Sequence, residues 1–188
     1  MKLQISRHHL TKNEIVSEEH EILRAQKDLK QFNILYDRYY VRIFEYIYQR
    51  VQTEAQAADI TSDTFIKAME NLKSYKPMGV PFASWLFRIA RNEIFIQYHK
   101  GKKIRQINFS SQDIIDITEE IEEIKPNKID LVIEAIKQLN PEETELIEMK
   151  YFEKRSYMEI GNILELTENN AKVKTHRVVQ KLRSIINS

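Results

Sequence analysis

Apolar residues recur at intervals of three and four along most of this 188-residue chain, the spacing that places them on one face of an α-helix. The densest run consists of Phe32, Leu35, Tyr36, Tyr39, Tyr40, Ile43, Phe44, Ile47 and Val51. At this spacing the tyrosines are expected to pack in the core with their hydroxyls at its rim. Only three glycines and four prolines occur, which disfavours tight turns between strands. The sequence therefore predicts an all-α protein.

The helical pattern divides into two small modules joined by an acidic linker. The first module is predicted over residues 17–101, with a helix beginning near Ser17 and a loop at residues 73–81 that contains Pro77, Gly79 and Pro81. Thr53 is expected to cap the helix from Glu54 to Leu72. Residues 102–128 lack a sustained period and are predicted to be the linker. The second module is predicted over residues 129–188.

Charge is unevenly distributed although the formal net charge is only +1. Basic residues concentrate in residues 88–105 and 172–183, whereas acidic residues concentrate in 113–123 and 134–168. Two basic regions are compatible with a nucleic-acid partner despite the low net charge. The absence of cysteine favours an intracellular protein, and no apolar run is long enough to span a membrane. We therefore expect a cytoplasmic protein without membrane insertion.

Aromatic and basic residues interleave between residues 82 and 103. At helical spacing, an apolar stripe comprises Phe82, Leu86, Ile89, Ala90 and Ile96. The opposite side comprises Arg88, Arg91, Asn92, His99, Lys102 and Lys103, and it is bordered by Trp85 and Phe95. Such a helix can neutralise phosphates and stack on unpaired bases. The alternative is an ordinary amphipathic helix with Trp85 in the core, and spacing alone leaves both interpretations open.

The second module shows the pattern of a helix-turn-helix. Asn140 and Pro141 begin one helix, and Ser156 with Glu159 forms the capping box of another. After a short connection, residues 168–186 form a longer basic helix, as in motifs whose second helix enters the major groove. A plain helical hairpin is the alternative.

These residues carry a resemblance that covers most of the chain. Region 2 of a bacterial RNA polymerase sigma factor resembles the segments Phe32-x-x-Leu35-Tyr36-x-x-Tyr39, Ala58-Asp59-Ile60-x-x-Asp63-Thr64-Phe65 and Phe82-x-x-Trp85-Leu86-x-x-Ile89-Ala90-Arg91-Asn92. Region 4 resembles Leu139-x-Pro141, Tyr151-Phe152, Ser156-Tyr157-x-Glu159-Ile160 and Lys172-x-Lys174-x-His176-Arg177-x-x-x-x-Leu182. With only these two modules and a short linker, the chain is similar to the extracytoplasmic-function group.

The resemblance implies three sets of contact residues. Those against the clamp helices of the largest polymerase subunit would be Asp59, Ser62, Asp63 and Phe65. Those that open and read the −10 element would be Trp85, Arg88, Arg91, Asn92, His99, Lys100, Lys102 and Lys103. Those at the −35 element would be Ser156, Asn169, Asn170, Lys172, Lys174, Thr175 and Arg177. The implied partners are core RNA polymerase, through its clamp helices and flap, promoter DNA, and an anti-sigma factor.

Several positions depart from the family pattern, including the weakened arginine cluster at His99, Lys100 and Gly101 and the segment Asn170–Lys174. Ser62 replaces a usual glutamine, Ile96 a usual aspartate, and Glu165 the usual glycine of the helix-turn-helix. The alternative function is therefore a helical interaction protein or a degenerate sigma-like antagonist that binds polymerase or another partner without reading DNA. No enzyme, cofactor or metal site is predicted, because the chain lacks a glycine-rich phosphate loop, paired histidines at metal spacing and a Ser-His or Cys-His set.

Overall fold

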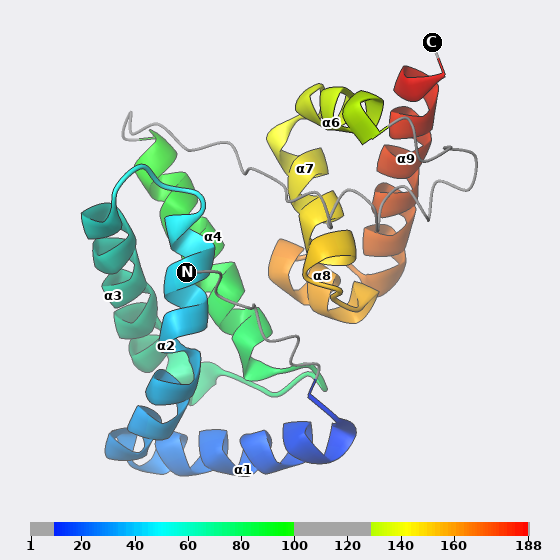
Figure 1. Ribbon diagram of the computed structural model, residues 1–188. Helices are drawn as coiled ribbons and strands as arrows, with labels where there is room; N and C mark the ends of the chain where they lie inside the picture. The colour runs from blue at the N-terminus through cyan, green and yellow to red at the C-terminus, as the bar shows by residue number, and fades with distance from the viewer. Residues whose placement is uncertain (1–9, 100–128, 188) are drawn as a thin grey trace. The chain divides into compact units, whose positions relative to one another are not determined.

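The computed structural model describes residues 10–99 and 129–187. These residues form helices and irregular connections without a strand, which confirms the all-α prediction. The described helices fall into two compact units, the N-terminal unit of α1 to α4 and the C-terminal unit of α6 to α9 (Figure 1). Lys100, at the end of the first predicted module, and the predicted linker, which includes Lys102 and Lys103, lie outside the described residues.

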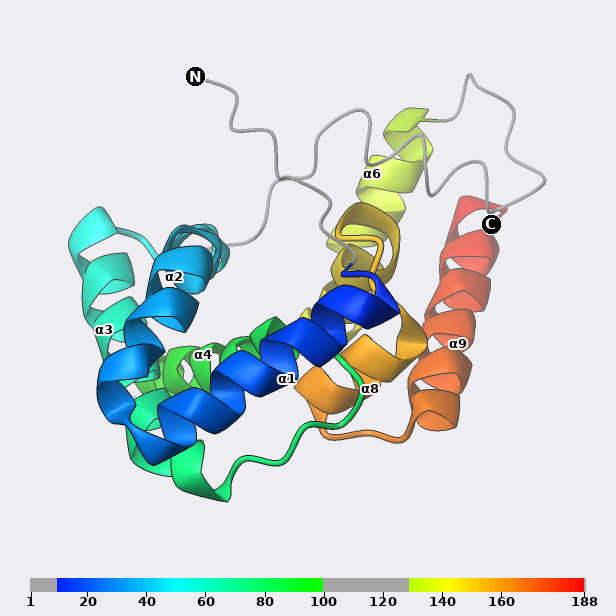
Figure 2. The same ribbon diagram turned by 90° about the horizontal axis from the view of Figure 1, so that it is seen from below.

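The described part of the N-terminal unit, residues 10–99, contains four α-helices and two short 3₁₀ turns. They are α1 (Lys12–Lys27), η1 (Leu29–Phe32), α2 (Asn33–Tyr48), α3 (Glu54–Asn71), η2 (Leu72–Ser74) and α4 (Phe82–His99). Helices α2, α3 and α4 pack against one another, and α1 lies across one end of them (Figure 2). The core includes Phe65, Phe82 and Leu86, which are all fully buried. Edge contacts of Phe32 with Phe65 and Phe82 close this core, each with 6.4 Å between ring centroids.

Helix starts in this unit follow local capping signals. The Thr53 hydroxyl accepts from the Gln56 amide at 3.2 Å, which confirms the predicted cap of α3. Helix α1 begins at Lys12, before the expected Ser17, because Thr11 and Glu14 form a capping box.

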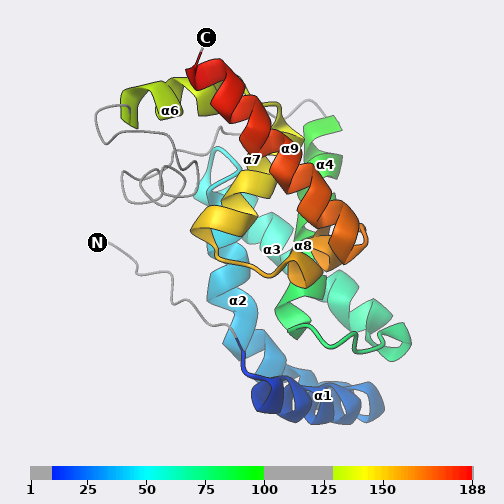
Figure 3. The same ribbon diagram turned by 90° about the vertical axis from the view of Figure 1, so that its right-hand side faces the viewer.

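The C-terminal unit is shorter and built from closely spaced elements. It contains α6 (Ile129–Lys137), α7 (Pro141–Ile147), a π-helical segment η4 (Glu148–Phe152), α8 (Tyr157–Leu164) and α9 (Glu168–Ile186). Capping boxes at Asn140 and Ser156 start α7 and α8, which confirms both predicted helix starts and the predicted capping box at Ser156. Helix α9 runs along α7, with α8 beside its beginning (Figure 3).

The turn between α8 and α9 keeps a helix-turn-helix geometry without the usual glycine. Glu165 adopts the left-handed conformation, with φ 57° and ψ 39°. The Leu166 amide donates to the Gly161 carbonyl at 2.8 Å. A Cβ at Gly161 would lie 2.7 Å from the Leu166 carbonyl oxygen, so the turn requires glycine at this earlier position. The departure at Glu165 is thus accommodated as a non-glycine residue in a left-handed C-cap.

Candidate nucleic-acid and protein interfaces

One face of α3 presents acidic and small polar side chains. Asp59, Ser62 and Asp63 are exposed, and the exposed Ile66 continues the same face. The Ser62 hydroxyl donates to the Ala58 carbonyl at 2.9 Å, so it is satisfied within the helix. Phe65 corrects the sequence prediction, because it is buried and cannot itself touch a partner protein.

A row of four aromatic rings follows α2 beside this face. Its members, one helical turn apart, are Tyr36, Tyr40, Phe44 and Tyr48, with successive centroid distances of 5.2, 6.3 and 5.9 Å. The row joins α3 through Phe65, whose ring lies 4.8 Å from that of Tyr36. Tyr39 is buried as expected, but Tyr36 is 39% exposed, so the expectation of a tyrosine core is wrong for Tyr36. Sequence periodicity could not distinguish the exposed rings from the buried ones, because the aromatic row lies next to the core-facing side of the same helix.

Trp85 belongs to the core of the N-terminal unit. Its side chain is only 7% exposed, and its ring lies 4.6 Å from Tyr75 and 5.3 Å from Phe82. The prediction that its ring is available to stack on an unpaired base is therefore wrong, and the alternative of a core tryptophan is correct. The physical reason is that the segment before α4 folds back over this side of the helix and places Tyr75 against the indole.

The second half of α4 carries the exposed polar side of the helix. Asn92 is exposed, and Arg88 and Arg91 are half-buried. The Arg91 guanidinium lies 5.3 Å from the ring centroid of Phe95, which is 41% exposed. Phe95, unlike Trp85, is an exposed aromatic ring, and it lies beside Arg91. Ile96 is also exposed, so the predicted apolar stripe is wrong at this end, where Ile94 is buried instead. The side chain of His99 lies outside the described residues.

Helix α9 exposes most of its predicted DNA-binding residues. Those exposed are Asn169, Asn170, Lys172, Lys174 and Arg177. Thr175 corrects the prediction, since it is fully buried and its hydroxyl donates to the Ala171 carbonyl at 2.8 Å. Ser156 is exposed, but its hydroxyl is occupied by the α8 capping box with Glu159.

Lys181 differs from the other lysines of α9 because its ammonium binds Glu143 of α7 at 2.7 Å. Burial raises the pKa of Glu143, but the hydrogen bonds from Lys181 and the Asn140 amide and the charge of Lys181 outweigh it, leaving that pKa below its ordinary value. This ion pair fastens α9 to α7.

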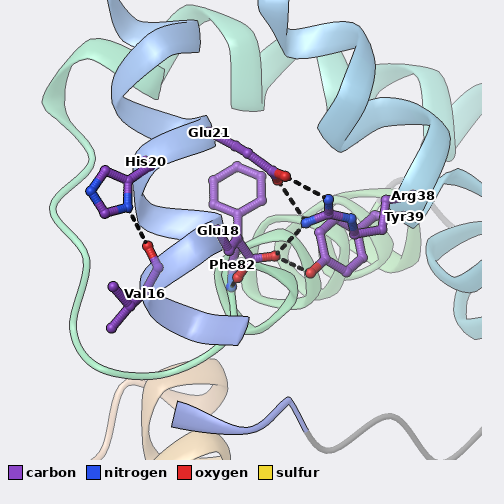
Figure 4. Close-up of polar contacts among 7 residues, drawn as sticks. All are labelled: Val16, Glu18, His20, Glu21, Arg38, Tyr39 and Phe82. Atoms are coloured by element: carbon purple, nitrogen blue, oxygen red, sulfur yellow. Dashed lines mark hydrogen bonds and ion pairs between the residues drawn. The ribbon is translucent and has the colours of Figure 1, made fainter. Parts of the chain in front are cut away.

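Sequence reasoning missed a buried carboxylate in the N-terminal unit. Glu18 of α1 is 2% exposed and accepts from the Phe82 backbone amide at 2.7 Å and from the Tyr39 hydroxyl (Figure 4). The Arg38 guanidinium lies 3.6 Å away. No local sequence signal identifies this site, because Phe82 is 64 positions from Glu18.

Within the described ranges, no helix is long and apolar enough to cross a membrane, and no His, Cys, Asp and Glu side chains cluster as a metal site would require.

Two family profiles match this chain. Sigma-70 region 2 matches residues 35–103, and Sigma-70, region 4 matches residues 135–184, so together they cover well over half of the chain. The first match contains most of α2 and all of α3 and α4, and the second contains α7, α8 and most of α9.

Individual relatives agree with these matches. The ECF RNA polymerase sigma factor BldN of Streptomyces coelicolor is 27% identical over 169 residues, which span 87% of this chain and 63% of BldN. The ECF RNA polymerase sigma factor SigL of Mycobacterium tuberculosis is 26% identical over 79% of this chain and 85% of SigL. The fold resembles that of CnrH in its complex with the cytosolic domain of CnrY, with a TM-score of 0.58 and 21% identity over 89% of this chain and 95% of that one. With both sigma regions matched in order along its length, the chain belongs to the sigma-70 family, and it is similar to members of the extracytoplasmic-function group of that family.

Proposed function

We propose that this chain is a sigma factor that binds core RNA polymerase and directs promoter-specific initiation of transcription. The observation that carries this proposal is the presence of two units, each matched to a sigma region and each with exposed or half-buried amide and basic side chains along one helix. The factor itself performs no chemistry. It supplies recognition and strand opening to the polymerase, in the cytoplasm.

Core polymerase docks on the joint surface of α2 and α3. Asp59 and Asp63 provide negative charge, and the row of Tyr36, Tyr40, Phe44 and Tyr48 provides partly exposed aromatic area beside it. Interfaces typically combine such an aromatic centre with a charged rim. Ser62 lies on the same acidic face, and Phe65 supports the row from beneath. The clamp helices of the largest subunit are the proposed partner of this surface, and the flap is the proposed partner of the C-terminal unit.

The −10 element is contacted by the exposed side of α4. Arg88 and Arg91 supply positive charge for phosphates, while the Asn92 amide can both donate to and accept from a base edge. His99, Lys100, Lys102 and Lys103 follow directly in the sequence and would extend the basic surface. Trp85 acts indirectly, as a core residue that fixes the position of α4.

The −35 element is contacted by the first half of α9. Lys172, Lys174 and Arg177 supply phosphate contacts, and the exposed Asn169 and Asn170 lie in the first turns, where recognition helices approach base edges. Each unit alone offers few contacts. Joining them in one chain raises the overall affinity by roughly 10²–10⁴ when both elements are engaged.

Because these surfaces recognise other macromolecules, a protein that covers them would inhibit the factor. The solved structure of CnrH is a complex with the cytosolic domain of another protein, CnrY. That arrangement supports the proposal that an anti-sigma factor controls the present chain. The inhibitor would compete with core polymerase for α2 and α3.

The decisive experiment mixes the purified chain with core polymerase and tests for promoter-specific transcripts. Promoter DNA fragments for this assay are identified by mapping the 5′ ends of the transcripts that appear when the chain is overexpressed. A sigma factor yields specific initiation, whereas an antagonist binds polymerase without it. Binding of neither core polymerase nor promoter DNA would overturn the proposal.

Polymerase docking is tested by Asp59→Lys and Asp63→Lys. Each should weaken association with labelled core enzyme by reversing charge at the interface while the helical signal in circular dichroism stays unchanged. Glu19→Lys makes the same change in net charge on α1, outside the proposed docking surface, and serves as the control. Equal affinities for all three variants would count against docking through α3.

Upstream DNA binding is tested by Lys172→Ala and Lys174→Ala. Each substitution removes one ammonium from a DNA phosphate and should therefore reduce the slope of log affinity against log salt by about 0.9. Lys181→Ala is the matched control, since its ammonium is already paired with Glu143. An identical slope in all three variants would show that α9 does not follow the phosphate backbone.

A further inference from the structure

Helix α1 lies entirely outside the matched sigma region, which begins at residue 35. It nevertheless contacts the connection between α3 and α4 at both ends. This connection, residues 72–81, leads directly into the helix proposed to contact the −10 element.

At one end, the Glu18 carboxylate holds the first residue of α4. The Phe82 amide has no partner inside its own helix, because the first amides of any helix lack one, and Glu18 accepts from it at 2.7 Å. A carboxylate at this position also interacts favourably with the helix dipole. Glu18 therefore acts as an N-terminal cap supplied by a different helix (Figure 4).

The surroundings of Glu18 are those of a fixed group rather than a solvated one. Burial raises its pKa, while the Phe82 amide, the Tyr39 hydroxyl and the Arg38 charge act in the opposite direction. Burial and the Glu18 charge raise the pKa of Tyr39 as well, so this phenol stays protonated and donates a hydrogen bond to the carboxylate. Glu18 thus links α1, α2 and α4 through hydrogen bonds whose geometry is set by buried partners.

At the other end, Gln26 holds the residues that follow α3. Its side-chain amide donates to the Leu72 carbonyl at 2.9 Å and to the Tyr75 carbonyl at 2.8 Å. Tyr75 in turn packs against Trp85 of α4, so the anchored backbone and the tryptophan are in contact. Between the two anchors, Lys76, Met78 and Gly79 are exposed.

We propose that α1 is a brace that sets the position of the connection 72–81 and of the start of α4, and that Glu18 and Gln26 are positioning residues for promoter opening. This inference rests on the proposed function. Side chains that contact DNA must be positioned to within a fraction of a helical turn, and rigid support from neighbouring residues provides this accuracy. The two residues touch no DNA themselves; they act through Phe82, Leu72 and Tyr75.

The test compares Glu18→Ala and Gln26→Ala with two control variants of α1 in the full chain bound to core polymerase. Glu21→Ala removes a carboxylate that pairs with Arg38 but does not contact the connection. Ile22→Val trims a buried α1 side chain and reports the effect of reduced stability alone. Affinity for core polymerase, affinity for closed promoter DNA and permanganate reactivity of unpaired thymines are measured on a promoter fragment obtained by 5′-end mapping.

For both brace variants, the fraction of open complexes should fall about tenfold, the effect of losing one strong hydrogen bond, while core affinity stays unchanged. Fluorescence emission from Trp85, the only tryptophan in the chain, should shift to longer wavelength as the packing of its ring against Tyr75 loosens. Glu18→Gln retains an acceptor for the Phe82 amide and should restore part of the opening.

If Glu18→Ala fails to fold, Gln26→Ala alone tests the positioning role. The Gln26 side chain is uncharged and half-buried, so removing it leaves no buried charge without a partner. Brace variants that open DNA as well as Ile22→Val would overturn the positioning role. A wild-type chain that never opens promoter DNA would overturn the proposed function instead, so the two failures are distinguishable.

Discussion

Helices α4 and α9 are both proposed to face DNA, yet they are held in place in different ways. The start of α9 is fixed locally: the Thr167 hydroxyl accepts from the Asn170 amide, and the Gly161–Leu166 bond closes the turn before it. Farther along, the Lys181–Glu143 ion pair joins α9 to α7. Helix α4 is fixed from a distance, by Glu18 of α1 at its first residue and by an ion pair between Lys67 of α3 and Glu93.

This difference means that the two units should respond differently to substitution. A change in the C-terminal unit acts through a few neighbouring residues of the turn. A change in the N-terminal unit is transmitted between helices far apart in the sequence, so its effects should appear at α1, α2 and α4 together. Four substitutions test this contrast.

The largest effect is expected for Trp85→Ala. Removing a core tryptophan should lower the free energy of unfolding by about 3–5 kcal/mol. Urea unfolding followed by circular dichroism measures it. Phe95→Ala, on the exposed side of the same helix, is the control and should change stability by less than about 0.5 kcal/mol. A Trp85→Ala variant of normal stability that fails only in promoter opening would restore the stacking role.

Gly161→Ala should act on the C-terminal unit alone. Its Cβ would lie 2.7 Å from the Leu166 carbonyl oxygen, so the turn must shift, at a cost of about 1–3 kcal/mol. Binding to upstream duplex should weaken, while the unfolding transition reported by Trp85 emission in the N-terminal unit should not move. A shift in that transition would contradict the independence of the two units.

Glu165→Gly should stabilise the same turn. The left-handed conformation costs a non-glycine residue about 1–2 kcal/mol, and the greater freedom of glycine in the unfolded chain offsets part of this gain. The expected net increase in the free energy of unfolding is up to about 1 kcal/mol, measured by thermal denaturation. A destabilised variant would mean that the Glu165 side chain makes interactions that outweigh backbone strain.

The smallest effect is expected for Glu143→Gln, which removes one charge of the pair that joins α7 to α9. The folded pKa of Glu143 is lowered, so its ionised form stabilises the fold above its ordinary pKa, and this contribution disappears as pH falls through the lowered value. The partly exposed pair is expected to contribute about 0.2–1 kcal/mol near neutral pH. Wild type and variant should converge in acid, whereas Glu134→Gln, in an exposed pair of α6, should match wild type throughout.

Sequence reasoning was most successful where the determining contacts are local. Thr53, Asn140 and Ser156 each bind a backbone amide three positions onward, so the residues that begin α3, α7 and α8 stand together in the sequence. The helix-turn-helix was predictable for the same reason. Even the early start of α1 had a readable signal, the Thr11–Glu14 capping box.

It was least successful where burial depends on what another segment covers. Helical spacing places Trp85 at the edge of the polar side of α4, but Tyr75 and Phe82 enclose it. Thr175 looks polar in the sequence but satisfies its hydroxyl inside its own helix and faces the core. The Glu18 cap requires knowledge that α1 meets the start of α4, which periodicity does not contain.

The π-helical segment Glu148–Phe152 affects the direction of the chain as it continues into α8 and α9. The Glu153 amide bonds the Glu148 carbonyl at 3.0 Å, which encloses one residue more than an α-helical turn. Each residue rotates an α-helix by about 100°. Deleting one residue here would convert the segment to an α-turn and rotate the exit of the chain by that angle about the α7 axis. The one additional residue of the π-helical turn therefore determines the direction in which the chain enters α8, and through α8 the direction in which it enters α9.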